Sequence, residues 1–130
     1  MTSVELAAWF DAGRTITIIG TRAGLDSLAS PLRAGHGGAV EVATEPPAEP
    51  FSGAAASIQI LATDEAGVAV ERRGDDVCIV GDRAGLGILG DNLHRLAVDP
   101  ESLGGHIHIE PFPGHPYLRP GSAPLVVEAR

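Results

Sequence analysis

The chain has 130 residues, the usual size of one domain with one hydrophobic core, and 44% of them are hydrophobic. Its formal net charge is −8, and its nine basic residues are all Arg. This balance argues against nucleic acid or an anionic membrane as partner, because phosphate binding depends on clustered cations, and it suits a basic protein partner. We therefore expect a single domain over residues 1–130 with a mainly aliphatic core, since only 4% of the residues are aromatic.

Residues 1–14 are predicted to form a short N-terminal helix. Thr2 and Glu5 have the spacing of a capping box, and the stretch VELAAWF is followed by Gly13, which would stop a helix. The segment lacks the basic opening and long apolar stretch of a signal peptide. No segment approaches the roughly 18 apolar residues of a membrane span. A cytoplasmic protein without a membrane partner is therefore expected.

The chain contains an internal repeat. The stretch IIGTRAGLDSL, residues 18–28, recurs sixty-one positions later as IVGDRAGLGIL, and eight of twenty aligned pairs are identical when residues 15–34 are placed on 76–95. The match resumes at an offset of sixty-seven, where GGAVEV aligns with GGHIHI and SIQIL aligns with PLVVE. We therefore divide the domain into repeat one, residues 15–64, and repeat two, residues 77–130.

Each repeat is predicted to fold as a β-α-β-β unit. The alternating apolar runs TITIIG and DVCIVG have strand character, and Thr21 or Asp82 then stands where a side chain can accept hydrogen bonds from the first helical amides. Leucines at helical spacing mark one apolar face of the helix that follows. Pro31 is expected to shorten or bend the first helix, whereas the second is predicted over residues 84–97.

Residues 65–76 connect the two repeats and are predicted to include the first arm of a hairpin that turns near Gly74 and Asp75. Valines on this arm face Val77 and Ile79 on the other. The whole predicts an α+β fold of two tandem β-α-β-β repeats with pseudo-twofold symmetry, in which about seven mainly antiparallel strands carry helices on one face. One continuous sheet and two packed sheets are both compatible with this pattern.

The stretch GGHIHIEPFPGHP is the strongest chemical candidate. On a strand, Ile107 and Ile109 point to one face, and His106, His108 and Glu110 point to the other. Two imidazoles and a carboxylate can bind a divalent metal if further ligands converge, and the available histidines for this are His94 and His115. A solvated sheet face is the simpler interpretation, a protein-binding face is a third, and we assign no metal ligand.

Other motifs carry less chemistry. GTRAG and GDRAG precede helices, whose free amides attract anions, but neither has the glycine pattern of a dinucleotide site or the Lys of a P-loop, so structural turns are expected. Cys78 lies in the apolar run VCIV and is expected to be a buried, inert thiol. The sequence has no nucleophile elbow and no recognisable triad. We expect no catalytic residue and no cofactor.

The proline-rich stretch FPGHPYLRPGS, residues 112–122, is expected to form a stiff exposed loop. Tyr117 and Arg119 are residue types enriched in binding hot spots. A rigid connector whose Tyr117 and Leu118 cover the edge of the core is the alternative. Repeat one has the analogous PPAEPFSG, which is acidic where this loop is basic and aromatic.

Residues 77–129 resemble the bacterial polymorphic-toxin immunity proteins of the family numbered thirty-two. The resemblance lies in GDRAGLGILGDNLHRLA, GGHIHIEP and GSAPLVVEA, and it includes His106, His108 and the strand from Ser122 to Glu128. It implies a non-enzymatic protein that binds and neutralises a toxin. Repeat one departs from the pattern at the histidines and in its loop.

Three hypotheses follow from these observations. The leading one is an immunity protein that binds a toxin domain, possibly a basic one; the alternatives are a metal-binding protein or metal-dependent enzyme that uses the His-x-His-x-Glu strand, and a structural or regulatory homodimer that pairs through an uncovered sheet face or edge. The candidate partner-binding residues are His106, His108, Glu110, His115, Tyr117 and Arg119.

Overall fold

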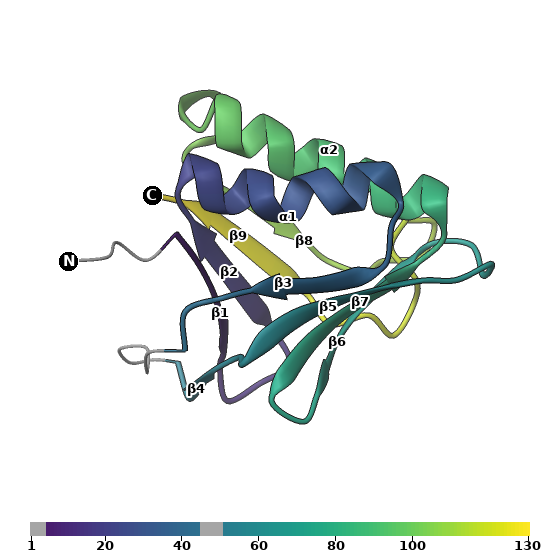
Figure 1. The fold of residues 1–130 in the computed structure, drawn as a ribbon. Helices are drawn as coiled ribbons and strands as arrows, with labels where there is room; N and C mark the ends of the chain where they lie inside the picture. Colours follow the sequence, from purple (N-terminus) through teal and green to yellow (C-terminus); the bar gives the residue numbers. More distant parts are fainter. Residues whose placement is uncertain (1–4, 45–50) are drawn as a thin grey trace.

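The computed structural model describes residues 5–44 and 51–130, and within these ranges it confirms an α+β fold (Figure 1). It contains two α-helices, a short 3₁₀ helix and nine strands in the described part of the chain. In chain order the elements are β1 (Leu6–Phe10), β2 (Ile16–Gly20), α1 (Arg22–Ala34), β3 (Gly38–Glu41), β4 (Gly53–Ala54), β5 (Ser57–Ala62), β6 (Val68–Arg73), β7 (Asp76–Gly81), α2 (Arg83–Val98), η1 (Glu101–Leu103), β8 (His106–Ile109) and β9 (Leu125–Ala129).

The strands form two sheets rather than one. The first has the order β4-β1-β2-β9-β8, and the second has the order β3-β5-β7-β6. In each sheet one central pair is parallel, β2 with β9 and β5 with β7, and the remaining pairs are antiparallel. Each sheet therefore takes its strands from both halves of the chain, so that neither half completes a sheet by itself.

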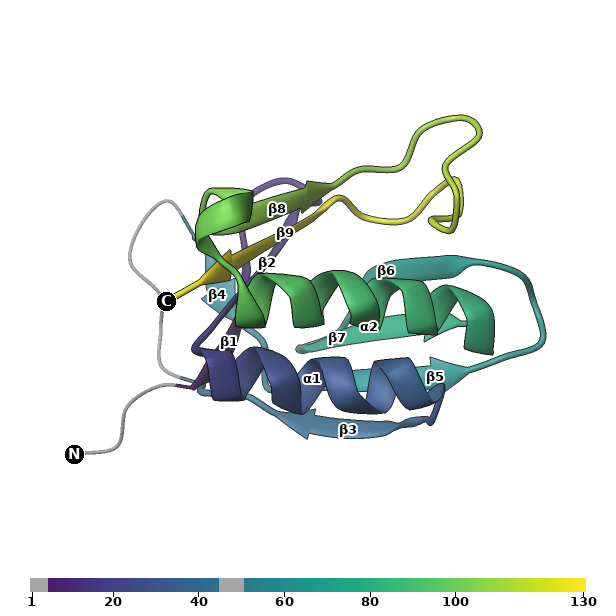
Figure 2. The same ribbon diagram turned by 90° about the horizontal axis from the view of Figure 1, so that it is seen from above.

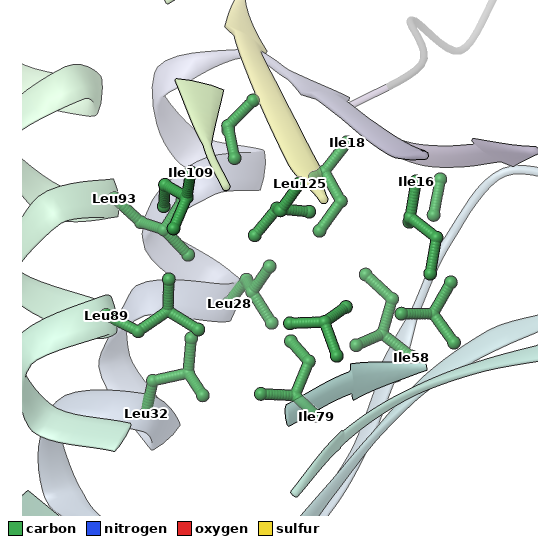
Figure 3. Packing of buried hydrophobic residues seen from close by; sticks show 14 of the residues in the cluster. Ile16, Ile18, Leu28, Leu32, Ile58, Ile79, Leu89, Leu93, Ile109 and Leu125 are labelled. Atoms are coloured by element: carbon green, nitrogen blue, oxygen red, sulfur yellow. The ribbon is translucent and has the colours of Figure 1, made fainter. Parts of the chain in front are cut away.

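Both helices lie on the same side of the two sheets, and the core fills the space between them (Figures 1 and 2). Figure 3 shows leucines of both helices pointing toward isoleucines of both sheets. Full burial of such a side chain contributes about 1.5–3 kcal/mol each, so this single cluster is the main source of stability. Its fully buried members include Ile16, Ile18, Leu25, Leu28, Leu32, Ile58, Ile60, Ile79, Leu86, Leu89, Leu93 and Leu96.

The repeated Gly-Thr/Asp-Arg-Ala-Gly motif starts each helix, as predicted. The Thr21 hydroxyl accepts a hydrogen bond from the Gly24 N–H at 3.1 Å, and an Asp82 carboxylate oxygen accepts one from the Gly85 N–H at 2.8 Å. A Cβ atom at Gly24 would lie 1.7 Å from the Glu5 carbonyl oxygen, so the helix can approach the start of β1 only with glycine there. The motif is thus a structural turn.

The predicted N-terminal helix is wrong, because Leu6–Phe10 form strand β1. This strand pairs with β2 on one side and with β4 on the other, and four of its five residues are buried. A strand inside a sheet can bury both of its faces, so its short apolar run shows no clear alternation and is easily mistaken for a helical segment. Thr2, the proposed cap, lies outside the described residues.

The other local predictions agree with the structure. Strands β6 and β7 are joined by Gly74 and Asp75, and Gly74 has the left-handed φ of 62° that this tight turn requires. Helix α2 spans 16 residues, whereas α1 continues only to Ala34, three residues beyond Pro31, and spans 13. The two-residue strand β4 had no recognisable signal in the sequence.

Candidate functional site

Strand β8 places two histidines on the outside of the molecule. His106 and His108 are exposed, and their rings form a T-shaped pair with centroids 5.1 Å apart. Ile107 and Ile109 point the opposite way and pack against the core. The alternation predicted for this strand is therefore present, and β8 stands at one end of its sheet (Figure 2).

A groove of about 570 Å³ adjoins β8. Its walls come from α2, from η1, from β8 and from the loop that follows β8, and they combine apolar side chains with a cation and a carboxylate. The lining residues are Asn92, Arg95, Leu103, Ile107, His108, Ile109, Glu110, Phe112, His115 and Tyr117. Four of the six candidate residues predicted from the sequence thus line a single groove.

The loop wall of this groove is fixed by His115. Its ring lies 4.7 Å from the ring of Phe112 and 4.8 Å from that of Tyr117, measured between centroids. Its Nδ1 accepts hydrogen bonds from the backbone N–H groups of Tyr117 at 3.2 Å and Leu118 at 2.9 Å. Nδ1 must therefore be unprotonated, which assigns the proton of the neutral ring to Nε2. The proline-rich loop is held in one shape by these contacts.

Tyr117 attaches the loop to α2 and does not extend into solvent. The side chain is buried, and the Asn92 amide donates a hydrogen bond to its hydroxyl at 3.0 Å. Burial raises the pKa of the Tyr117 hydroxyl above its ordinary value of 10.0, against a smaller opposite effect of the Asn92 hydrogen bond. Tyr117 forms part of the groove wall while it also covers the edge of the core, as the alternative prediction for this loop had it.

Arg119 lies apart from the groove. Its guanidinium donates hydrogen bonds to the carbonyl oxygens of Glu65 and Ala66 and lies 3.6 Å from the Glu65 carboxylate. Only 17% of its side chain is exposed. These contacts attach the loop to the β5–β6 connection. The Arg119 guanidinium is therefore engaged within the protein, and little of its surface is accessible to a partner.

The two histidines that could have completed a metal site are engaged in other contacts. The His94 ring lies 3.0 Å from an Asp26 carboxylate oxygen between the helices, and Nδ1 of His115 is occupied by backbone N–H groups. Within residues 5–44 and 51–130, no three His, Cys, Asp or Glu side chains converge as metal ligands would. Cys78 is buried, and burial raises the pKa of its thiol, with an opposite effect from nearby Arg73.

Sequence reasoning missed several residues of the groove. Phe112 is 54% exposed, which is unusual for a large aromatic side chain, and Asn92 and Arg95 extend from the last turns of α2. Asn92 and Arg95 are three positions apart and so share a helix face, which is a signal that the sequence contained. Nothing in the sequence placed that face beside β8, because the juxtaposition depends on the tertiary fold.

The fold and this surface define a class of protein: a small α+β module with a groove beside a sheet end, and without a convergent metal-binding cluster in its described residues. The chain belongs to the family described as Immunity protein 32, whose model matches residues 15–35 and 76–129, more than half of the chain. The match covers β2 and α1 in the first half and everything from β7 to β9 in the second.

The remaining comparisons found nothing: no curated protein and no solved structure matches the chain. In the described part of the chain, no helix is long and apolar enough to cross a membrane. Immunity proteins act against toxins, so family membership indicates a toxin as the partner in general.

Proposed function

We propose that this chain is an immunity protein that neutralises a toxin by binding it directly in the cytoplasm, without catalysing a reaction. Membership in the Immunity protein 32 family carries this proposal. The groove beside β8 supports it, because it joins exposed aromatic and imidazole side chains to a loop that is already held in one conformation. A surface that is ordered before binding loses less conformational entropy on association.

The proposed partner-binding surface consists of His106, His108, Glu110, His115 and Tyr117, together with Phe112. A stable complex buries about 1,600 Å² in total, so the interface must extend beyond the groove onto neighbouring elements. The net charge of −8 favours a basic toxin, since opposite charges accelerate the encounter of two proteins. Arg119 contributes by holding the loop rather than by touching the toxin.

The polypeptide encoded by the adjoining gene is the natural test partner. Co-expression of this chain should restore the growth of cells that produce the polypeptide, and the two should purify as a complex. A His106→Ala/His108→Ala double variant should bind at least about 10-fold more weakly, whereas Glu41→Ala should bind normally, because Glu41 occupies the position in repeat one that aligns with His108. A harmless neighbour, or a toxic one that this chain neither binds nor neutralises, contradicts the proposal.

A further inference from the structure

Resting on the proposed function, we propose that an extended segment of the toxin binds along the open edge of β8 as an additional strand. Its alternate apolar side chains enter the adjoining groove, and its flanking residues are basic. Strand addition of this kind gains affinity from main-chain hydrogen bonds and specificity from pockets for every second side chain.

The backbone of β8 has a defined pattern of free groups. The Ala129 N–H donates a hydrogen bond to the Gly105 carbonyl at 2.8 Å, and Gly105 stands opposite Ala129 in the register of β8 with β9. Hydrogen-bonded and non-bonded pairs alternate along an antiparallel ladder. Ile107 and Ile109 therefore bond to β9, and the N–H and C=O groups of His106 and His108 point away from the sheet, toward the open edge.

Two other strand edges in the described part of the chain, those of β6 and β1, are covered. Strand β6 is flanked by the segment 117–123: the Val68 N–H donates to the Tyr117 carbonyl at 2.7 Å, and the Val70 N–H donates to the Ser122 hydroxyl at 2.9 Å. Strand β1 is covered by β4. Two longer end strands remain, β3 and β8, and the groove of about 570 Å³ adjoins β8.

The groove fits the side chains of an added strand. The inward-facing isoleucines of β8, Leu103 and Tyr117 form apolar walls, so every second side chain of the new strand would meet an apolar surface. Three exposed glutamates lie on neighbouring elements: Glu101 in η1, Glu110 directly after β8, and Glu128 in β9 opposite His106. Arg95 lies on the opposite wall of the groove and carries a positive charge. The otherwise basic toxin segment is therefore expected to place one acidic side chain beside Arg95.

The charges favour a toxin segment over a second copy of this chain. Two copies paired edge to edge would bring two proteins of charge −8 together and would place the three glutamates of one beside those of the other. Like charges in such a pairing destabilise it, whereas a basic segment meets complementary charge.

Amide hydrogen exchange in the complex with the adjoining gene's polypeptide tests the inference without any substitution. In the free protein the amides of His106 and His108 should exchange quickly, and those of Ile107 and Ile109 slowly. Binding should slow exchange at both histidines by at least about 10-fold, because their N–H groups acquire acceptors. Unchanged exchange at both histidines in a formed complex would overturn the inference while the proposed function stands.

Two variants of one residue separate the backbone from the side chain. His108→Pro removes an edge N–H without breaking a bond to β9, and His108→Ala keeps that N–H while it removes the imidazole. We expect at least about 100-fold weaker binding for His108→Pro and less than about 10-fold for His108→Ala. Equal losses would assign the contact to the imidazole instead, and if His108→Pro does not fold by circular dichroism, the exchange experiment decides. A concentration-dependent dimer that hides the histidine amides without the toxin would identify a second copy as the occupant.

Discussion

The two halves of the chain supply the same kinds of strand to the two sheets but differ in the strand that each places at a sheet end. In the first half this strand is β3, with the sequence GAVE, and in the second it is β8, with the sequence HIHI. Both pair with a single neighbour, β5 or β9. The two strands therefore have the same backbone role at a sheet end, and they differ in their side chains, with exposed histidines on β8 alone.

The loops that follow β3 and β8 also differ between the two halves. In the first half, the Ser52 and Ala55 N–H groups donate to carbonyls of β1 at 2.7 and 2.8 Å and cover its edge. In the second half, residues 117–123 of the loop cover the edge of β6, and Phe112, His115 and Tyr117 of the same loop line the groove. The described part of the first loop thus closes a sheet, while the second loop closes a sheet and presents a surface.

Matched substitutions in the two halves should differ most in their effect on the free energy of unfolding at the helix starts. Gly24→Ala would place a Cβ 1.7 Å from the Glu5 backbone oxygen, so the start of β1 must move. Gly85→Ala meets Asp82 Oδ1 at 2.8 Å and Val68 Cγ2 at 2.9 Å, and its nearest backbone atom, the Gly67 carbonyl carbon, lies at 3.2 Å, so the clash is less severe. We expect a loss of about 3 kcal/mol for Gly24→Ala and about 1 kcal/mol for Gly85→Ala, in part because alanine favours the helix.

Urea unfolding of both variants measures this difference, and the parent chain supplies the reference slope. Equal losses in the two variants would mean that the contact between Glu5 and α1 is looser than the structure has it. The two helix starts would then tolerate a Cβ atom about equally well, contrary to the contacts at Gly24 and Gly85.

The second comparison concerns the two loops that cover strand edges. The Ser122 hydroxyl is buried and accepts the Val70 N–H, so Ser122→Ala leaves a buried donor without a partner, at a cost of about 1–3 kcal/mol. The exposed Ser52 hydroxyl lies within hydrogen-bond distance of the carbonyls of Phe10 and Asp11, which water can replace as partners. Ser52→Ala should therefore cost less than about 0.5 kcal/mol.

Thermal unfolding of the two serine variants, with the melting temperatures converted to free energies, checks this ranking. A Ser52→Ala variant that loses as much as Ser122→Ala would show that β1 depends on its loop as strongly as β6 does. In that case the two loops would contribute equally to the stability of the fold.

Much of the fold could be predicted because its signals are local. Seven strands and both helices follow from alternation, capping side chains and leucine spacing, and the repeat identified the corresponding elements in each half. Strand β1 was mistaken for a helix because pairing partners on both sides, supplied from elsewhere in the chain, bury it. The exchange of strands between the halves is also non-local, so the sequence left one sheet and two sheets equally open.

The candidate site could be predicted only along β8 itself. Alternation placed His106 and His108 outside, and this is how the structure has them. The opposite wall of the groove depends on where α2 passes β8, and the commitment of Arg119 depends on the position of the β5–β6 connection. No periodicity within a single segment encodes either contact.

The smallest expected difference between the halves is at the two helix caps. Thr21→Ala removes one acceptor from the Gly24 N–H and should cost about 1 kcal/mol. The Asp82 carboxylate accepts from the N–H groups of both Gly85 and Gly67, at 2.8 and 3.2 Å, so Asp82→Ala loses two bonds and should cost up to about 2 kcal/mol. Asp82→Asn retains an acceptor oxygen and should recover most of that loss. Urea unfolding of the three variants resolves these steps. If Thr21→Ala proved the costlier change, the hydrogen bond between Asp82 and the Gly67 N–H would add nothing measurable to the cap of α2.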